Sequence, residues 1–469
     1  MTVTPPYVQT EGVNAVLDAL AAAGVNAVAT APGVSQPIEA LEGVDDAGSG
    51  MEEARREPPV DGGAGSVRVV DRKVFGKEEA LLRFSPSYEP KFDAYQGLKY
   101  QPKAADELTR REGKVIREFI EGAHARGMRA YFQLSAVQLY GLRDEDRPLL
   151  PNGQPPRARM VNTASVASDE VRAYVCAQLE DLLESYPDID GFRHDWPEYP
   201  PYRLGDAFLD FSPNAEKAAR RLSFDFERMR RATDRLYQRL SRLGNADLLG
   251  FQTPRGAAIE AVRALTLEPA LAEAFRFKSA LTVQYVRELR EALDRIPGGR
   301  DKELSPNAFP PPWSLLSGMD FGRVADYADS INMKLYTMHW PLMVWFYANE
   351  LLEQNHGLDE TLLVRTISNL FDMEDGGQGV CLQDYVYPPP DKSHRAGVEA
   401  QQRKVAQALS ACAGKARLYP VVHGYGPADN FAERLQTGWE TEAPGIWVNR
   451  YCYLSERKLA AIAALDHER

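Results

Sequence analysis

The chain has 469 residues and a formal net charge of −12, from 67 acidic and 55 basic side chains. This balance argues against nucleic acid and anionic membranes as partners, because both require clustered Lys and Arg. The length suits one large α/β barrel or two to three ordinary domains. A small molecule or an oligosaccharide is therefore the expected partner, and the sequence leaves the oligomeric state open.

The cysteines and the start of the chain favour a cytoplasmic protein. Cys176, Cys381, Cys412 and Cys452 are scattered without a CxxC pair, which predicts neither a zinc site nor a disulfide framework. Four reduced thiols are typical of a reducing compartment. No apolar stretch approaches the ~18 to 20 residues that cross a bilayer, and the first residues lack a basic region followed by an apolar run.

The first elements are a predicted helix over 11–24 and a predicted strand over 25–31. Residues 33–105 then break the pattern, with a tip at about 44–64 that is rich in Gly, acidic residues and Pro. Aromatic residues are frequent in the limb that follows. A loop of this length is usually functional or partly disordered, so we expect an insertion with a flexible tip and a packed aromatic return limb.

From about residue 106 to the end, helical patterns alternate with short apolar runs. The remaining predicted strands are 128–134, 189–195, 248–253, 303–309, 330–336, 416–423 and 445–452. A proline-stiffened loop at 376–394 precedes the seventh strand and is expected to act as a lid. Eight strands in alternation with helices predict a single (β/α)₈ TIM barrel domain over residues 1–469. An open doubly wound sheet is the alternative, but no Gly-rich phosphate turn follows an early strand.

In such a barrel the chemistry lies beyond the carboxyl ends of the strands. These positions are rich in aromatic and amide side chains, which suit the apolar faces and the hydroxyl groups of sugars. Some of the tryptophans equally suit a role in capping the barrel core. The substrate-binding candidates are Gln133, Trp196, Tyr336, His339, Trp340, His423, Trp447 and Asn449.

Hydrolysis of a glycosidic bond needs two carboxyl groups held ~5 to 9 Å apart. Asp195 and Glu198 share the end of the third predicted strand. Arg193 alternates onto the same face as Asp195, and we expect its charge to keep Asp195 ionised as nucleophile or base. His194 is expected to point toward the helices. The general acid is then Glu198, or Asp384 in the loop before the seventh strand.

The run Gly191–Asp195, GFRHD, resembles the GFRxD strand of α-amylase-type glycoside hydrolases, in which this Asp is the nucleophile and this Arg its partner. Three longer stretches look like uncharacterised bacterial glycoside-hydrolase-like (β/α)₈ proteins: YPDIDGFRHDWPEYP, FPPPWSLLSGMDFGRVADYADSINMKLYTMHW and GIWVNRYCYLSERKL. The resemblance covers most of the chain from about residue 100. It implies a carbohydrate-active barrel with the carboxylate of DWPEY at its centre.

The leading hypothesis is therefore a glycoside hydrolase that needs no cofactor. One alternative is a metal-assisted sugar lyase, isomerase or epimerase, in which His339, His423 and a carboxylate hold a divalent ion. The other is a carbohydrate-binding barrel without catalysis. The sequence does not specify the sugar, the linkage or the stereochemical outcome.

Overall fold

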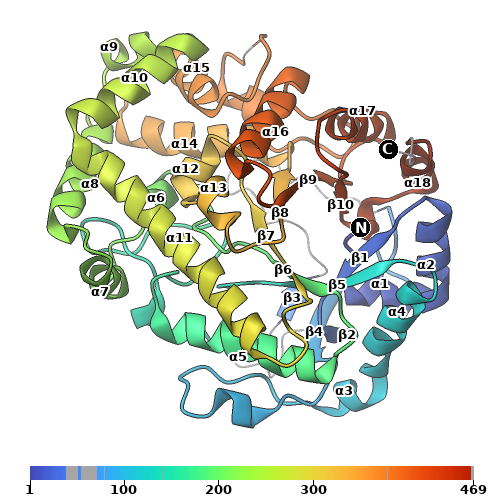
Figure 1. Cartoon of the computed structure of the whole chain (residues 1–469). Helices are drawn as coiled ribbons and strands as arrows, with labels where there is room; N and C mark the ends of the chain where they lie inside the picture. Colours follow the sequence, from blue (N-terminus) through green and yellow to red (C-terminus); the bar gives the residue numbers. More distant parts are fainter. Residues whose placement is uncertain (39–50, 54–70, 79, 140, 378, 466–469) are drawn as a thin grey trace.

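The computed structural model describes residues 1–38, 51–53, 71–78, 80–139, 141–377 and 379–465. A seven-stranded parallel sheet lies in the middle of the molecule, and helices surround it (Figure 1). In spatial order the strands are β1 (Ala27–Thr30), β5 (Arg129–Leu134), β6 (Gly191–His194), β7 (Glu303–Ala308), β8 (Ser330–Leu335), β9 (Arg417–His423) and β10 (Trp447–Asn449). Strands therefore follow one another around the sheet in chain order.

The first three residues of the chain lie between the two outer strands of this sheet. Val3 N donates to Ala29 O and Ala29 N donates to Met1 O, each at 2.8 Å, which pairs the segment with β1. On its other side, Thr2 N donates to Val448 O of β10 at 2.9 Å. The sheet is therefore curled so far that one short segment bonds with both of its outer strands.

Seven of the eight predicted strands are confirmed, and the prediction of a strand over 248–253 is wrong. Leu248 ends α9 (Asn245–Leu248), residues 249–251 form the 3₁₀ turn η3 (Leu249–Phe251), and Gln252 and Thr253 lie between η3 and the next helix. Gly244 N donates to the Asp247 carboxylate at 3.0 Å, which favours a helical turn at this point. Leu249 is 62% exposed, so the apolar run does not enter the sheet.

The helices cover the outside of the sheet, and short breaks separate two pairs of consecutive helices. The break at Gly113 separates α3 from α4, and Ser223, with φ of 62°, lies in the break between α7 and α8. The helices are α1 (Pro5–Glu11), α2 (Val13–Ala22), α3 (Glu107–Glu112), α4 (Lys114–His124), α5 (Asp169–Ser185), α6 (Leu204–Ala207), α7 (Pro213–Arg221), α8 (Phe226–Leu240), α10 (Pro254–Leu267), α11 (Pro269–Arg295), α12 (Trp313–Ser317), α13 (Phe321–Val324), α14 (His339–Gln354), α15 (Glu360–Phe371), α16 (Val398–Cys412), α17 (Ala428–Trp439) and α18 (Glu456–Ala463). Further 3₁₀ turns are η1 (Phe92–Tyr95), η2 (Asp144–Asp146), η4 (Leu382–Tyr385) and η5 (Tyr451–Tyr453). Over the part of the chain described, no helix has both the length and the apolar character needed to cross a bilayer.

The segment after β1 contains a second, antiparallel sheet, in the order β2 (Gly33–Ile38), β4 (Leu81–Pro86), β3 (Met51–Glu53). The tip predicted to be flexible, 44–64, lies outside the described residues except for β3. The aromatic limb that follows packs on α5, because the hydroxyls of Tyr88 and Tyr95 donate to Asp181 at 3.0 and 2.9 Å. The expected packed return limb is thus present at these residues.

The inside of the curled sheet is strongly polar. Glu303 of β7 accepts hydrogen bonds from Arg129 and Tyr131 of β5 at 2.7 and 2.9 Å, and pairs with Arg417 of β9 at 3.0 Å. Neither β5 nor β9 adjoins β7, so these contacts cross the interior. Branched aliphatic side chains usually fill this space in a barrel. Here ion pairs and hydrogen bonds do so at the amino ends of the strands, where Glu303 is 6% exposed and Arg129 and Arg417 are 43% and 48% exposed. The buried carboxylate requires such partners.

Candidate functional site

Asp195 leaves the carboxyl end of β6 and forms an ion pair with Lys334 of β8. Lys334 Nζ lies 2.5 Å from Asp195 Oδ1, with side chains 1% and 13% exposed. Asn307 of β7, the strand between them, donates to the same oxygen at 3.3 Å. Burial raises the pKa of Asp195, but the Lys334 charge and the hydrogen bonds from Lys334 and Asn307 bring it below its ordinary value. The result is an ionised, partly exposed carboxylate at the strand ends.

Arg193 lies deeper in the interior, and its link to Asp195 passes through Asn307. Its guanidinium donates to Thr2 Oγ1 at 3.1 Å and to Asn307 Oδ1 at 3.4 Å, and lies 3.8 Å from the ring centre of Trp447. Full burial lowers the Arg193 pKa to about 10. The sequence predicts Arg193 as the direct charge partner of Asp195, whereas in the structure this partner is Lys334. The sequence offered one signal for Lys334, because it lies near the end of the predicted strand 330–336, in alternation with Asn332 and Tyr336.

Glu198, three residues beyond Asp195, is fully buried. One carboxyl oxygen accepts from Phe309 N at 2.8 Å and the other from the Ser317 hydroxyl. Burial raises the pKa of Glu198 to about 7, although Lys334 and both hydrogen bonds act in the opposite direction. The two carboxyl groups therefore have pKa values shifted apart, which is the pattern that separates an acid from a base at one site.

Trp196 occupies the turn between these two carboxyl groups. Its φ is 50°, a left-handed conformation that a bulky residue rarely adopts. Lys334 Nζ lies 4.7 Å from its ring centre, within the range of a cation–π interaction. The indole N–H is buried and has no hydrogen-bond partner among the described residues. A ligand oxygen would supply one.

His194 points away from the interior, as the alternation of the strand predicts. It is fully buried and lies edge-on to Tyr285 of α11, with ring centres 6.5 Å apart. Burial lowers its pKa to about 3, so the ring is neutral. It packs between sheet and helix and does not join the strand-end site.

Four predicted substrate-binding residues come together at the carboxyl ends of β8, β9 and β10. Asn449 Nδ2 donates to the Tyr336 hydroxyl at 2.9 Å. The Tyr336 ring is edge-on to His423 and His339, at 5.1 and 5.7 Å. These four side chains are therefore neighbours in the structure.

Trp447 and Gln133 lie on the inner face of the sheet. Trp447 contacts Tyr131 edge-on at 5.6 Å as well as Arg193. Gln133 is opposite Arg193 in the strand register. Over the described part of the chain, the side-chain oxygens of Gln133 and Asn449 are buried without a hydrogen-bond donor.

Trp340 and Asp384 have surroundings of another kind. Trp340 is 2% exposed and packs on Trp313 of α12, with ring centres 5.1 Å apart. Asp384 accepts hydrogen bonds from Val380 N and Cys381 N at 2.8 and 3.3 Å, and these bonds lower its pKa. Trp340 therefore belongs to packing between helices, and Asp384 to the closure of its own loop. Among the described residues, no group of three or more His, Cys, Asp or Glu side chains has the arrangement of a metal site.

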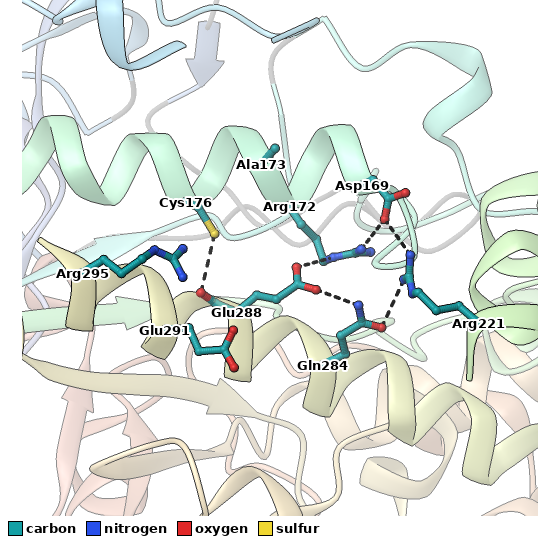
Figure 2. Close-up of a pocket in the computed structure, with 9 residues that line it drawn as sticks. All are labelled: Asp169, Arg172, Ala173, Cys176, Arg221, Gln284, Glu288, Glu291 and Arg295. Atoms are coloured by element: carbon teal, nitrogen blue, oxygen red, sulfur yellow. Dashed lines mark hydrogen bonds and ion pairs between the residues drawn. The ribbon is translucent and has the colours of Figure 1, made fainter. Parts of the chain in front are cut away.

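A charged pocket of about 560 Å³ lies elsewhere, on the outside between α5 and α11 (Figure 2). Arg172 bonds with Asp169 and with Glu288, the latter at 2.7 Å, and Arg221 bonds with Asp169 and Gln284 at 3.2 and 3.3 Å. These charged and polar side chains bond with one another, so the pocket contains an ion-pair network that joins α5, α7 and α11. The strand ends remain the candidate site.

Comparison with known proteins finds no matching family model and no matching curated sequence. Solved structures do match. A polyextremophilic β-galactosidase from the Antarctic haloarchaeon Halorubrum lacusprofundi is 12% identical, with a TM-score of 0.50 over 99% of this chain and 57% of that chain. The chain has a glycoside-hydrolase-like fold. It spans little more than half the length of that β-galactosidase, and 12% identity shows the fold alone.

Two further matches have lower scores. The catalytic domain of β-amylase from Paenibacillus polymyxa is 8% identical, with a TM-score of 0.47 over 98% of this chain and 94% of that chain. The PgaB (BpsB) glycoside hydrolase domain from Bordetella bronchiseptica is 12% identical, with a TM-score of 0.40 over 93% and 96% of the two chains. TM-scores below 0.5 are too low to support a conclusion from either protein.

Proposed function

We propose that this chain is a carbohydrate-active enzyme that hydrolyses a glycosidic bond at the carboxyl end of an eight-stranded barrel. Residues 1–3 take the eighth strand position, between β10 and β1. The observation that carries the proposal is the pair Asp195 and Glu198, whose pKa values are shifted in opposite directions. Glycoside hydrolysis uses one ionised carboxylate and one carboxylic acid.

In this proposal Asp195 is the nucleophile or the base. Lys334 keeps it ionised, and Asn307 fixes the position of the same oxygen. Glu198 is the proton donor, because a pKa of about 7 leaves it largely protonated in mildly acidic solution. To deliver this proton, the carboxyl must exchange its hydrogen bond with Phe309 or Ser317 for one to the leaving oxygen. Asp384 suits the acid role less, because its lowered pKa keeps it ionised.

The polar groups without partners support a substrate with several hydroxyl groups. Trp196 Nε1 offers a donor, and the side-chain oxygens of Gln133 and Asn449 offer acceptors. The rings of Trp196 and Tyr336 provide apolar faces next to these groups. Sugars present both features at once, alternating C–H faces with hydroxyl groups.

The test is hydrolysis of a panel of aryl glycosides and oligosaccharides by the full-length protein. We expect Asp195→Asn to lose about 10³-fold or more of the rate, and Glu198→Gln to lose about 10²- to 10⁴-fold on poor leaving groups. Glu198→Gln is expected to retain more of its rate on nitrophenyl glycosides, whose leaving group needs little protonation. Asp384→Asn is the matched control and keeps the wild-type rate. An Asp195→Asn variant with full activity refutes the scheme.

A carbohydrate-binding barrel without catalysis is the second candidate. It is favoured by the burial of Glu198, both of whose carboxyl oxygens already accept hydrogen bonds. It predicts saturable quenching of tryptophan fluorescence by a sugar that is never turned over, with loss of the signal in Trp196→Phe. Turnover at the same site eliminates this candidate. The metal-assisted alternative predicts inactivation by EDTA and recovery with a divalent cation.

A further inference from the structure

An apolar cavity of about 420 Å³ lies among the helices that follow β6, β7 and β8. Side chains from α8, α10, α11, α12 and α15 line it. Its walls are mainly aliphatic and aromatic, and include Leu236, Leu240, Phe251, Leu265, Phe275 and Phe371. Cavities of 300 to 1,000 Å³ with few polar groups are typical small-molecule sites. Neither Asp195 nor Glu198 is among the lining residues, so this cavity is separate from the strand-end site.

Lys278 of α11 is the buried cation of this cavity, at 4% exposure. Its Nζ donates to the carbonyl oxygens of Ala207 and Leu316, each at 2.8 Å. Burial lowers the pKa of Lys278 to about 7. In its protonated form the group has three donors, and the third has no hydrogen-bond acceptor in the described ranges. The ring centre of Tyr199 is 5.7 Å from Nζ, too far to accept a hydrogen bond. Protonated Lys278 therefore has one N–H for which the described residues provide no acceptor.

Thr233 of α8 provides a second polar group without a partner. It lines the same cavity at 6% exposure, and its hydroxyl is buried with no hydrogen bond to any described residue. A threonine within a helix commonly bonds the carbonyl one turn earlier. A buried hydroxyl without a partner is unfavourable and rare in native proteins. The cavity thus presents two donors that the protein itself leaves unused.

The acidic groups near Lys278 are already satisfied. Asp210, which also lines the cavity, accepts hydrogen bonds from backbone N–H groups of Leu149 and Ser212 and from the Tyr199 hydroxyl at 3.2, 2.8 and 3.1 Å. Asp206, whose charge also acts on Lys278, pairs with Arg159 at 2.8 Å. Asp247 and Glu260 also line the cavity and pair with Arg239 and Arg263 at 2.9 and 3.1 Å. None of these carboxylates accepts a hydrogen bond from Lys278 within the described residues.

We propose that this cavity binds an aliphatic molecule whose one polar end is an oxygen acceptor, either a carboxylate or a hydroxyl. The oxygen accepts from Lys278 and from Thr233, and the aliphatic chain lies along the leucine and phenylalanine side chains. An ammonium at the same end is disfavoured, because protonated Lys278 repels it and only the Thr233 hydroxyl oxygen could accept a hydrogen bond from it.

The test is calorimetric titration of the full-length protein with decanoate, 1-decanol and decylammonium, each below its aggregation concentration. We expect one site per chain for decanoate, 1-decanol or both, and at least tenfold weaker binding of decylammonium. The relative affinity of the first two identifies the head as charged or neutral. No binding of either oxygen-headed chain, or equal binding of decylammonium, overturns the proposal.

Two pairs of variants locate the binding. Ala261→Trp, which fills the cavity from α10, is expected to abolish it. Ala258→Trp lies on the exposed side of the same helix, outside the cavity lining, and is expected to leave it unchanged. Lys278→Met and Thr233→Val are each expected to weaken binding about tenfold, the equivalent of one charge-assisted or buried hydrogen bond. Thr233→Val removes no bond within the protein, so it decides the question even where Lys278→Met fails to fold. Unchanged binding in Ala261→Trp or in Thr233→Val refutes the site.

Discussion

Replacing Lys334 by Met tests the ion pair at the centre of the candidate site. Met keeps a long unbranched side chain and removes the charge. Lys334 and Asp195 lie 2.5 Å apart with side chains 1% and 13% exposed, so the variant leaves a mostly buried carboxylate without its counter-ion. Breaking a buried pair in this way destabilises proteins by about 3 to 5 kcal/mol. The Asn307 hydrogen bond and the partial exposure of Asp195 remain, so we expect about 3 kcal/mol.

Urea unfolding of four proteins measures this effect: wild type, Lys334→Met, Asp195→Leu and the double variant. Because two apolar side chains can replace a buried pair at little net loss, the double variant is expected to be destabilised by less than the sum of the single changes. The folded-state pKa of Asp195 lies below its ordinary value, so the ionised carboxylate stabilises the folded protein at pH values above the unfolded-state pKa. This stabilisation is lost as the pH falls through the folded-state pKa. The difference between wild type and Lys334→Met should therefore shrink in acid. Strictly additive changes, or a difference that does not depend on pH, refute the reasoning.

Three further predictions concern single side chains. The pKa of Glu198 is raised from 4.5 to about 7, so the native state keeps a proton that the unfolded chain releases. The free energy of unfolding of the wild type should therefore fall by roughly 3 kcal/mol as the pH rises from about 4.5 through 7. Glu198→Gln should lack this fall in urea curves at pH 5 and 8, and parallel behaviour of the two proteins contradicts the burial argument. Trp340→Ala should lower the free energy of unfolding by about 3 to 5 kcal/mol and leave the affinity for sugar unchanged. A loss of sugar affinity without a loss of stability would show that Trp340 binds the sugar. Thr233→Val removes a buried hydroxyl without a partner, so in the absence of ligand it should raise the melting temperature, by the equivalent of about 1 kcal/mol; a lower melting temperature means that the hydroxyl has a partner.

The sequence located the strands that are bounded on both sides by clear helical patterns. It failed at 248–253, where an apolar run of the same kind forms a helical turn. Periodicity cannot separate these outcomes in a run so short. It also assigned no role to residues 1–3, since three residues carry no pattern of their own. Their position follows only from the curl of the sheet, which places the two outer strands within reach of one segment.

The site shows the same division between local and long-range information. Alternation along one strand correctly directed Arg193 inward and His194 toward the helices. Alternation cannot say which residue of another strand meets Asp195, because that depends on the register and curvature of three strands. Trp340 resembles the other strand-end tryptophans in the sequence. It lies one residue inside α14, and the helix turns its side chain toward Trp313.

Asn307 explains how a buried guanidinium and a carboxylate can lie so close and still act separately. An amide has one acceptor oxygen and one donor nitrogen. The oxygen accepts from Arg193 at 3.4 Å, while the nitrogen donates to Asp195 at 3.3 Å. An aspartate here would bond with Arg193 but repel Asp195, and a leucine would leave both groups without this contact. The asparagine thus isolates the Arg193 charge in the interior, so that Asp195 has one direct counter-ion, Lys334, and remains partly open to a substrate at the strand ends.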